Sequence, residues 1–115
     1  MEIKQADVVL CAFYFSDTNQ SKNRPVLVFK DNLPYDDFIA VPISSKIHHL
    51  YQDEMMMSDI DFIDGTIPVA SKLMMRKTFV VSKKAILKKY GTISAESYKK
   101  YHRSFCQYFN CAGSI

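Results

Sequence analysis

Two basic side chains, Lys22 and Arg24, precede a proline and an apolar run in the stretch SKNRPVLVF, residues 21–29. Pro25 fixes its own φ angle and biases Arg24 toward an extended backbone, so the start of a strand aims the Arg24 side chain. A guanidinium offers two parallel N–H donors to phosphate or carboxylate oxygens, which the ammonium of Lys22 does not. Arg24 is therefore a candidate anion-binding residue, although a surface cation that caps a turn has the same local sequence.

Histidines and cysteines offer a second set of reactive side chains. His48 and His49 follow the segment PISSK and belong to the residue type that suits acid and base catalysis near neutral pH. Cys11, Cys106 and Cys111 form an odd number without a CxxC pair, which is typical of reduced thiols and not of a disulfide framework or a zinc ribbon. We therefore expect neither a metal site nor a cofactor.

Length and composition indicate one globular domain. The chain has 115 residues, of which 48% are hydrophobic and 23% charged, and both values are ordinary for a compact domain. The apolar run VVLCAFYF, residues 8–15, is far shorter than the ~20 residues that cross a bilayer. The start MEIKQAD lacks the basic and apolar regions of a signal peptide. We expect a single domain over residues 1–115, in the cytoplasm and without membrane association.

The net charge is +3, from 15 Lys and Arg against 12 Asp and Glu. This mild excess permits nucleic-acid binding without requiring it. Acidic residues concentrate in residues 31–37 and 52–64, and basic residues in 22–24, 72–77 and 83–103. The distribution predicts an electrically two-sided surface.

The first two thirds of the chain have the short β-branched and aromatic runs of strands. The expected strands cover residues 7–15, 25–29 and 38–44, with one or two more within residues 65–81. The polar segment 16–24 predicts the loop of a hairpin. Pro42 cannot donate to a ladder of hydrogen bonds, which predicts a strand end, a bulge or an exposed edge at that residue.

The last third changes to a helical period. Ser82 as N-cap and Gly91 as terminator predict a short helix over residues 83–90. Ser94 is the N-cap of a second, amphipathic helix, AESYKKYHRSFCQYF, in residues 95–109. Its aromatic stripe consists of Tyr98, Tyr101, Phe105 and Tyr108 or Phe109. Strands followed by helices predict a small, partly closed β-barrel of the α+β class.

A family resemblance follows from the order of these segments. The segments that carry the resemblance are, in this order, ADVVLCAFYFSD, KNRPVLVF, FIAVPISSK, GTIPVASKLMMRKTFVVSKKAI and YGTIS. Almost the whole chain resembles the PemK/MazF toxins of type II toxin-antitoxin systems. The resemblance implies an SH3-like barrel that forms a homodimer. It also implies a sequence-selective endoribonuclease that cuts single-stranded RNA, such as mRNA, without metal and is neutralised by a cognate antitoxin peptide.

The resemblance assigns roles to individual residues. Arg24 is similar to the family's catalytic arginine, and Ser44 takes the place of a threonine or serine on the facing strand. Attack of a ribose 2′-OH on its own phosphate builds negative charge that Arg24 would stabilise, while Ser44 orients the phosphate or the attacking hydroxyl. The candidate RNA-binding residues around this site are Lys22, Phe15, Lys46, Lys72, Arg76 and His48, with the cations contacting phosphates and Phe15 stacking on a base.

Two departures from the family pattern keep other functions open. Some members carry a second arginine and an acid on the later strand, where this sequence has Lys72 and Met74. Because lysine lacks the planar fork of arginine, a weaker or inactive enzyme is one alternative. Another is a non-catalytic barrel that acts by binding, such as a CcdB-like gyrase poison or an RNA or protein adaptor.

Overall fold

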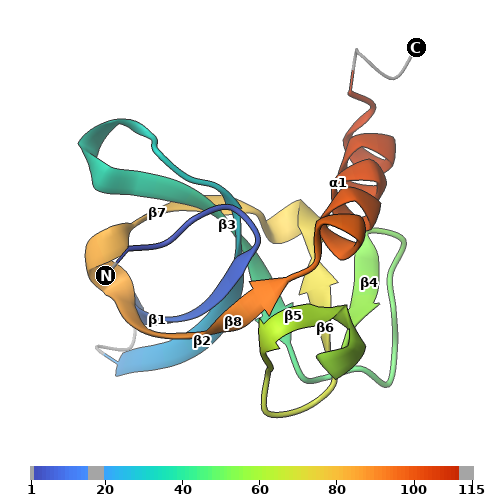
Figure 1. Ribbon diagram of the computed structural model, residues 1–115, viewed down its shortest axis with the longest axis horizontal. Coiled ribbons are helices and arrows are strands. Elements are labelled where there is room, and N and C mark those ends of the chain that lie inside the picture. The colour runs from blue at the N-terminus through green and yellow to red at the C-terminus, as the bar shows by residue number, and fades with distance from the viewer. Residues whose placement is uncertain (1, 16–19, 112–115) are drawn as a thin grey trace.

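The computed structural model describes residues 2–15 and 20–111, without the side chains of Tyr14, Phe15, Gln20 and Ser21. Eight antiparallel strands form a curled sheet, and one α-helix follows them (Figure 1). The strands are β1 (Asp7–Phe15), β2 (Gln20–Lys30), β3 (Asp37–Ser44), β4 (Glu54–Met57), β5 (Phe62–Gly65), β6 (Ser71–Met74), β7 (Phe79–Ser82) and β8 (Ile86–Ile93), and the helix is α1 (Ala95–Phe109). The expected α+β half-barrel is confirmed.

The sheet has the strand order β4-β6-β3-β2-β1-β8-β5, and β7 pairs with β3 off this path. On one edge β3 pairs with β2, and on the other it pairs with β7 through residues 37–40 and with β6 through residues 43–44. The change of partner turns β6 and its neighbour β4 away from β7. β4, β5 and β6 lie on the same side of the molecule as α1 (Figure 1).

Pro42 lies inside β3, not at the strand end, bulge or exposed edge that the sequence indicated. It is buried and stands opposite Val26 of β2. On the other edge of β3, Pro42 falls between the residues paired with β7 and those paired with β6. A residue without an N–H is tolerated there because this stretch has no ladder partner on that edge.

The two faces of the sheet bury two separate cores. Successive side chains of β2 point to opposite faces of the sheet. Leu27 and Phe29 pack in the core beneath α1, which also contains Tyr101. Val26 and Val28 pack in the core enclosed by the barrel strands. All of these side chains are at most 7% exposed. β2 is therefore held by packing on both faces over residues 26–29, which begin two residues after Arg24.

The short helix expected over residues 83–90 is wrong. Only Lys83–Ala85 forms a helical turn, of the 3₁₀ type, and β8 begins at Ile86. The Ser82 hydroxyl does accept the Lys84 N–H at 3.1 Å, but the chain then extends because β8 pairs with both β1 and β5. Gly91 is not a helix terminator: a Cβ there would collide with the Asp64 carbonyl oxygen, so glycine allows β5 and β8 to approach closely.

The C-terminal helix is confirmed. The Ser94 hydroxyl caps it by accepting the Ser97 N–H at 3.0 Å, and Asn110 ends it in the left-handed region with φ 54°. Tyr101 is completely buried, whereas Tyr108 and Phe109 are 39% and 44% exposed, so the buried stripe ends before them.

The other differences concern strand boundaries. β2 begins at Gln20, so the hairpin loop is shorter than residues 16–24, and Lys22 and Arg24 belong to the strand. β4 and β5 had no predicted counterpart. No helix of the described residues is long and apolar enough to cross a membrane.

Candidate active site

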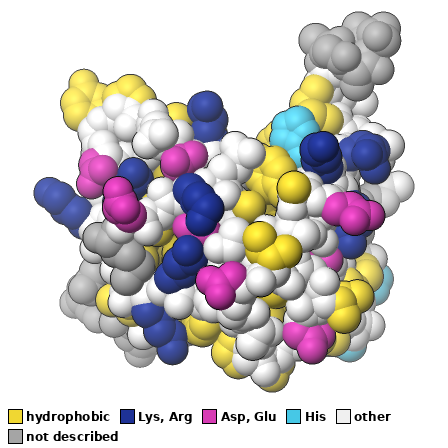
Figure 2. All heavy atoms as spheres, in the orientation of Figure 1, with side chains coloured by type: hydrophobic (Ala, Val, Ile, Leu, Met, Phe, Trp, Pro, Cys, Tyr) yellow, Lys and Arg dark blue, Asp and Glu magenta, His cyan; other side chains and the backbone are white. Residues whose placement is uncertain are grey.

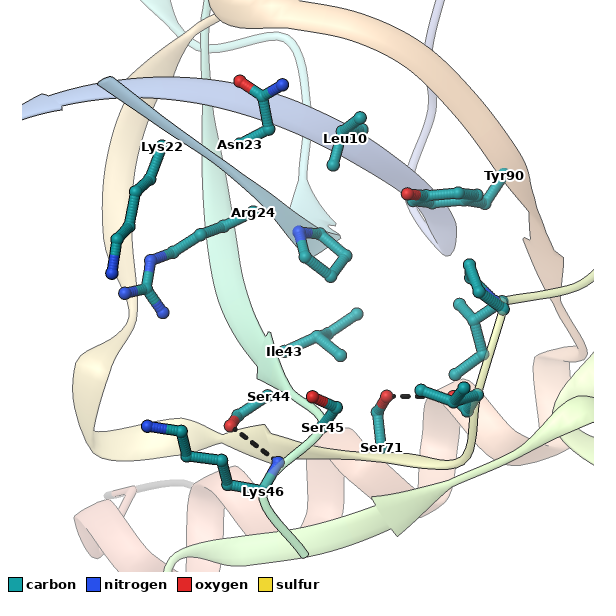
Figure 3. A pocket seen from close by; sticks show the side chains of 14 residues that line it. Leu10, Lys22, Asn23, Arg24, Ile43, Ser44, Ser45, Lys46, Ser71 and Tyr90 are labelled. Carbon is teal, nitrogen blue, oxygen red and sulfur yellow. Dashed lines mark hydrogen bonds between the residues drawn. The ribbon is translucent and has the colours of Figure 1, made fainter. Parts of the chain in front are cut away.

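A pocket of about 440 Å³ opens where the pairing of β2 and β3 ends (Figure 3). The last paired residues are Val26 and Pro42. Two residues further along their strands lie Arg24 and Ser44, and both line the pocket. Its volume is within the usual range for ligand sites, roughly 300–1,000 Å³. The two residues with expected catalytic roles are thus brought to one cavity.

One side of the pocket is cationic. The side chains of Lys22, Arg24 and Lys46 reach toward the same region (Figure 3). Within the described part of the chain, none of these three side-chain cations has a hydrogen-bond or ion-pair partner, and no described lining residue is acidic. Three uncompensated positive charges favour a polyanionic ligand at this side.

The Ser44 hydroxyl is held in place by the loop that follows β3. Its Oγ accepts a hydrogen bond from the Lys46 backbone N–H at 3.2 Å, a local turn typical of serine. Because this bond uses an oxygen lone pair, the Ser44 O–H proton is left to donate. Ser44 is half-buried at the pocket wall, so it can orient an anionic oxygen.

The opposite side of the pocket is apolar, and the sequence did not predict it. It is built by Leu10, Ile67, Pro68, Val69 and Tyr90. The carbonyl oxygen of Val69 already accepts the Ser71 hydroxyl at 3.0 Å. Tyr90 was missed because residues 83–90 have a helical pattern of charges, and no other signal marks it.

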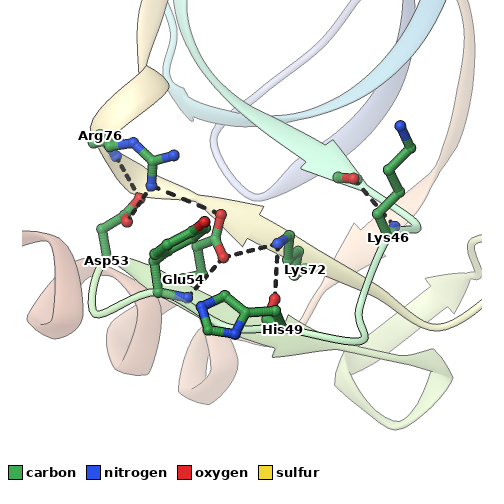
Figure 4. Close-up of polar contacts among 8 residues, drawn as sticks. Lys46, His49, Asp53, Glu54, Lys72 and Arg76 are labelled. Carbon is green, nitrogen blue, oxygen red and sulfur yellow. Dashed lines mark hydrogen bonds and ion pairs between the residues drawn. The ribbon is translucent and has the colours of Figure 1, made fainter.

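Lys72 and Arg76 lie in a separate, charge-balanced cluster (Figure 4). The Lys72 ammonium is 2.8 Å from Glu54 Oε1 and donates to the His49 carbonyl oxygen at 2.9 Å. Arg76 Nη1 is 2.6 Å from Asp53 Oδ1. Neither cation lines the pocket, and both are neutralised by carboxylates from the loop before β4 and from its first residue.

The Glu54 carboxylate is almost fully enclosed, with its side chain 2% exposed. Burial acts to raise its pKa, but hydrogen bonds from the Lys72 ammonium and the Tyr51 N–H outweigh burial and hold the pKa below its ordinary value. Glu54 is therefore ionised at neutral pH, and it holds Lys72 in place.

Two predicted site residues remain, His48 and Phe15. His48 is exposed in the loop between β3 and β4 and does not line it. Phe15 ends β1, but its side chain lies outside the described residues. In the described ranges, no three His, Cys, Asp or Glu side chains are arranged to hold a metal ion.

Comparison with known proteins places this geometry in context. A family model described as PemK-like, MazF-like toxin of type II toxin-antitoxin system matches residues 4–109. No curated protein sequence matches the chain.

Solved structures share the fold at low sequence identity. An endoribonuclease from Mycobacterial species, in complex with its cognate antitoxin, aligns with a TM-score of 0.74 at 12% identity over 96% of this chain and 97% of that one. The toxin MazF-mt6 from Mycobacterium tuberculosis aligns with a TM-score of 0.64 at 15% identity, over 89% of this chain and 96% of that one. MazF from Deinococcus radiodurans aligns with a TM-score of 0.68 at 13% identity, over 96% of this chain and 98% of that one. At these identities the likeness shows the fold.

Proposed function

The chain belongs to the family of PemK-like, MazF-like toxins of type II toxin-antitoxin systems, and we propose that it is a metal-independent, sequence-selective endoribonuclease that cleaves single-stranded RNA. The observation that carries this proposal is the pocket in which Arg24 and Ser44 meet beside two further unpaired cations, with no carboxylate among the described lining residues. Such a site attracts a phosphate and repels no part of an RNA backbone.

Arg24 is the proposed catalytic residue. In the reaction the ribose 2′-OH loses its proton to water and its oxygen forms a bond to the adjacent phosphorus. The bond from phosphorus to the 5′-oxygen breaks, and the 5′-oxygen takes up a proton from water. Negative charge grows on the non-bridging oxygens in between. A guanidinium placed at the mouth of the pocket stabilises this charge with two parallel hydrogen bonds. The Ser44 hydroxyl donates to the phosphate or to the attacking oxygen and fixes its orientation.

Lys22 and Lys46 supply the rest of the positive charge in this proposal. Their ammonium groups flank Arg24 in the pocket (Figure 3) and neutralise neighbouring phosphates. Because the side chains themselves provide the charge that a metal ion supplies in many nucleases, the proposed reaction proceeds without one.

The proposal extends to partners and location. The structural relative from Mycobacterial species was solved with its cognate antitoxin. Because this chain belongs to the same family of toxins, we propose that a cognate antitoxin peptide binds it as well. We also propose that the chain forms a homodimer and acts on mRNA in the cytoplasm.

Incubation with a long unstructured RNA in the presence of EDTA tests the proposal. The wild-type protein should produce discrete cuts, and Arg24→Ala should reduce the rate by about 100- to 1,000-fold, the usual cost of removing one donor to a developing oxyanion. Arg103→Ala is the matched control, because Arg103 is an exposed arginine of α1 outside the pocket.

Thermal melting of all three proteins shows whether the fold is retained. Full activity of Arg24→Ala would contradict the assignment of Arg24. Intact RNA with all proteins, together with inhibition of gyrase, would support the binding alternative instead.

A further inference from the structure

We propose that the apolar side of the pocket is a nucleobase subsite, in which the ring of Tyr90 stacks on an unpaired base next to the phosphate held by Arg24. The inference rests on the proposed function and makes its substrate more specific. It states that the enzyme requires one unstacked, unpaired nucleotide at the cut site. At this one subsite, binding depends on the presence of a base more than on which base it is.

The two sides of the pocket match the two parts of a nucleotide. Figure 3 shows the cations Lys22, Arg24 and Lys46 on one side and Leu10 and Tyr90 across the cavity. A nucleotide has the same division, with a charged phosphate at one end and the apolar faces of a base at the other. One nucleotide can therefore satisfy both sides at once, whereas inorganic phosphate or an apolar molecule satisfies only one.

The ring of Tyr90 is held in a fixed position. It packs against the core beneath α1, and the Lys88 ammonium lies 5.0 Å from its centroid. Tyr90 lines the pocket whereas Lys88 does not, so the ring borders the cavity on a side that Lys88 does not fill. A cation on one face and a base on the other is a favourable arrangement for an aromatic ring.

The backbone beside Tyr90 is fixed as well. Side chains at Gly65 or Gly91 would collide with the facing strand, because β5 and β8 approach closely at these two glycines. Gly65 also has a φ of +66°, which other residues rarely adopt. The stacking surface therefore stands on paired strands and not on a mobile loop, which suits a preorganised binding site.

The chemistry of the apolar side favours stacking over readout of base edges. Ile67, Pro68 and Val69 bring no polar side chain, and the Val69 carbonyl is already occupied by Ser71. An aromatic face accepts any base, so this step is tolerant of sequence. A base in a duplex cannot expose its face to the ring, so pairing at this position excludes the substrate.

The first experiment compares cleavage of an intact oligonucleotide with cleavage of the same RNA carrying one abasic nucleotide at or beside the mapped cut. Tyr90→Leu should lower kcat/KM on intact RNA by about 5- to 150-fold, the measured range for loss of one stacked base. Tyr90→Phe, which keeps the aromatic ring, should recover most of the kcat/KM that Tyr90→Leu loses. On the abasic RNA, wild type and Tyr90→Leu should be equally slow, because the lost partner is the same.

The second experiment measures binding and does not depend on cleavage. The probe is a 2′-O-methyl RNA, which has no free 2′-OH, with 2-aminopurine placed at successive positions. Wild type and Tyr90→Phe should quench the fluorescence at one position, and Tyr90→Leu should lose the quench and bind more weakly. Tyr108→Leu removes a partly exposed tyrosine outside the pocket and is the matched control.

The outcomes separate this inference from the proposed function. RNA that is bound with Tyr90-dependent quenching but never cut supports the subsite and contradicts the nuclease. RNA that is cut equally well by wild type and by folded Tyr90→Leu overturns the subsite and leaves the nuclease intact. A Tyr90→Leu defect that persists unchanged on the abasic RNA also overturns the subsite, because the defect then does not involve the base.

Discussion

At the scale of single residues, the structure divides the basic side chains into two groups. Lys22, Arg24 and Lys46 line the pocket without a carboxylate partner in the described part of the chain. Lys72 and Arg76 are paired with Glu54 and Asp53, and such close pairing leaves little charge for a phosphate. The residue type alone does not distinguish these groups, since the neutralising acids lie 18 and 23 positions away.

Replacement of Lys72 by methionine should affect stability more than RNA binding. The side chains of Lys72 and Glu54 are 9% and 2% exposed, and loss of one partner leaves a buried carboxylate uncompensated. We expect Lys72→Met to lower the free energy of unfolding by about 3 kcal/mol. Urea unfolding at neutral pH measures this change.

The double variant Lys72→Met with Glu54→Leu is the control, since it removes both charges. It should recover most of the lost free energy, because replacing a whole buried pair by apolar groups is often neutral. A tenfold or greater loss of RNA affinity in folded Lys72→Met, with unchanged stability, would instead support the predicted phosphate contact.

The sequence predicted one side of the pocket and missed the other for a physical reason. The proline at the start of a strand marked Arg24 as an anion-binding candidate, and the family resemblance assigned roles to Arg24 and Ser44. Tyr90 has neighbours, KKAILKKY, that suit an amphipathic helix as well as a strand. Only pairing with β1 and β5, which are remote in sequence, selects the strand. Local propensity cannot report such a tertiary choice.

At the scale of elements, Asp61 attaches α1 to the sheet. Asp61 Oδ1 accepts the Ser97 hydroxyl at 2.7 Å, Oδ2 accepts the Ser58 N–H at 2.9 Å, and its carbonyl oxygen accepts the Ser94 N–H at 2.8 Å. A carboxylate at the first turn also suits the dipole of α1. Burial acts to raise the pKa of Asp61, but these side-chain hydrogen bonds outweigh it and lower the pKa.

The lowered pKa values of Asp61 and Glu54 predict acid sensitivity. Their ordinary values are about 3.9 and 4.3, and both values are lower in the folded protein. The stability that these carboxylates contribute is therefore complete above about pH 5 and is lost as the pH falls through the lowered folded values. Urea unfolding at pH 7, 5, 4 and 3 should show a level region followed by a decline.

Asp61→Asn should flatten part of that decline and lower the free energy of unfolding at pH 7 by about 1.5 kcal/mol. Asp64→Asn is the matched control, because Asp64 is an exposed aspartate of the adjacent strand without an ion pair among the described residues. If the free energy of unfolding of Asp61→Asn falls as steeply at acid pH as that of the wild type, other groups control the pH dependence.

At the scale of the whole molecule, charge is segregated locally and not by halves. On the face in Figure 2, acidic and basic side chains are interspersed, so the two-sided surface expected from the sequence is not met there. Ion pairs between segments remote in sequence, such as Lys83 with Asp36 at 3.8 Å, mix the two signs. The pocket departs from this mixture, because the charged side chains among its described lining residues are all cations.

Binding of a 2′-O-methyl RNA should therefore depend on salt through the pocket cations. A single-stranded ligand changes the slope of log K against log salt by about 0.7 for each phosphate neutralised. Lys46→Ala should reduce the slope by about this amount, and Lys84→Ala, an exposed lysine outside the pocket, should not. Equal slopes for the wild type and Lys46→Ala would show that Lys46 contacts no phosphate.

The pairing of β1 with β8 has a consequence for biosynthesis. Leu10 and Tyr90, from these two strands, both line the pocket. Domains form progressively as the ribosome extends the chain, but β1 has no β8 to pair with until residue 93 has left the exit tunnel. A nascent or prematurely terminated chain therefore lacks one wall of the pocket.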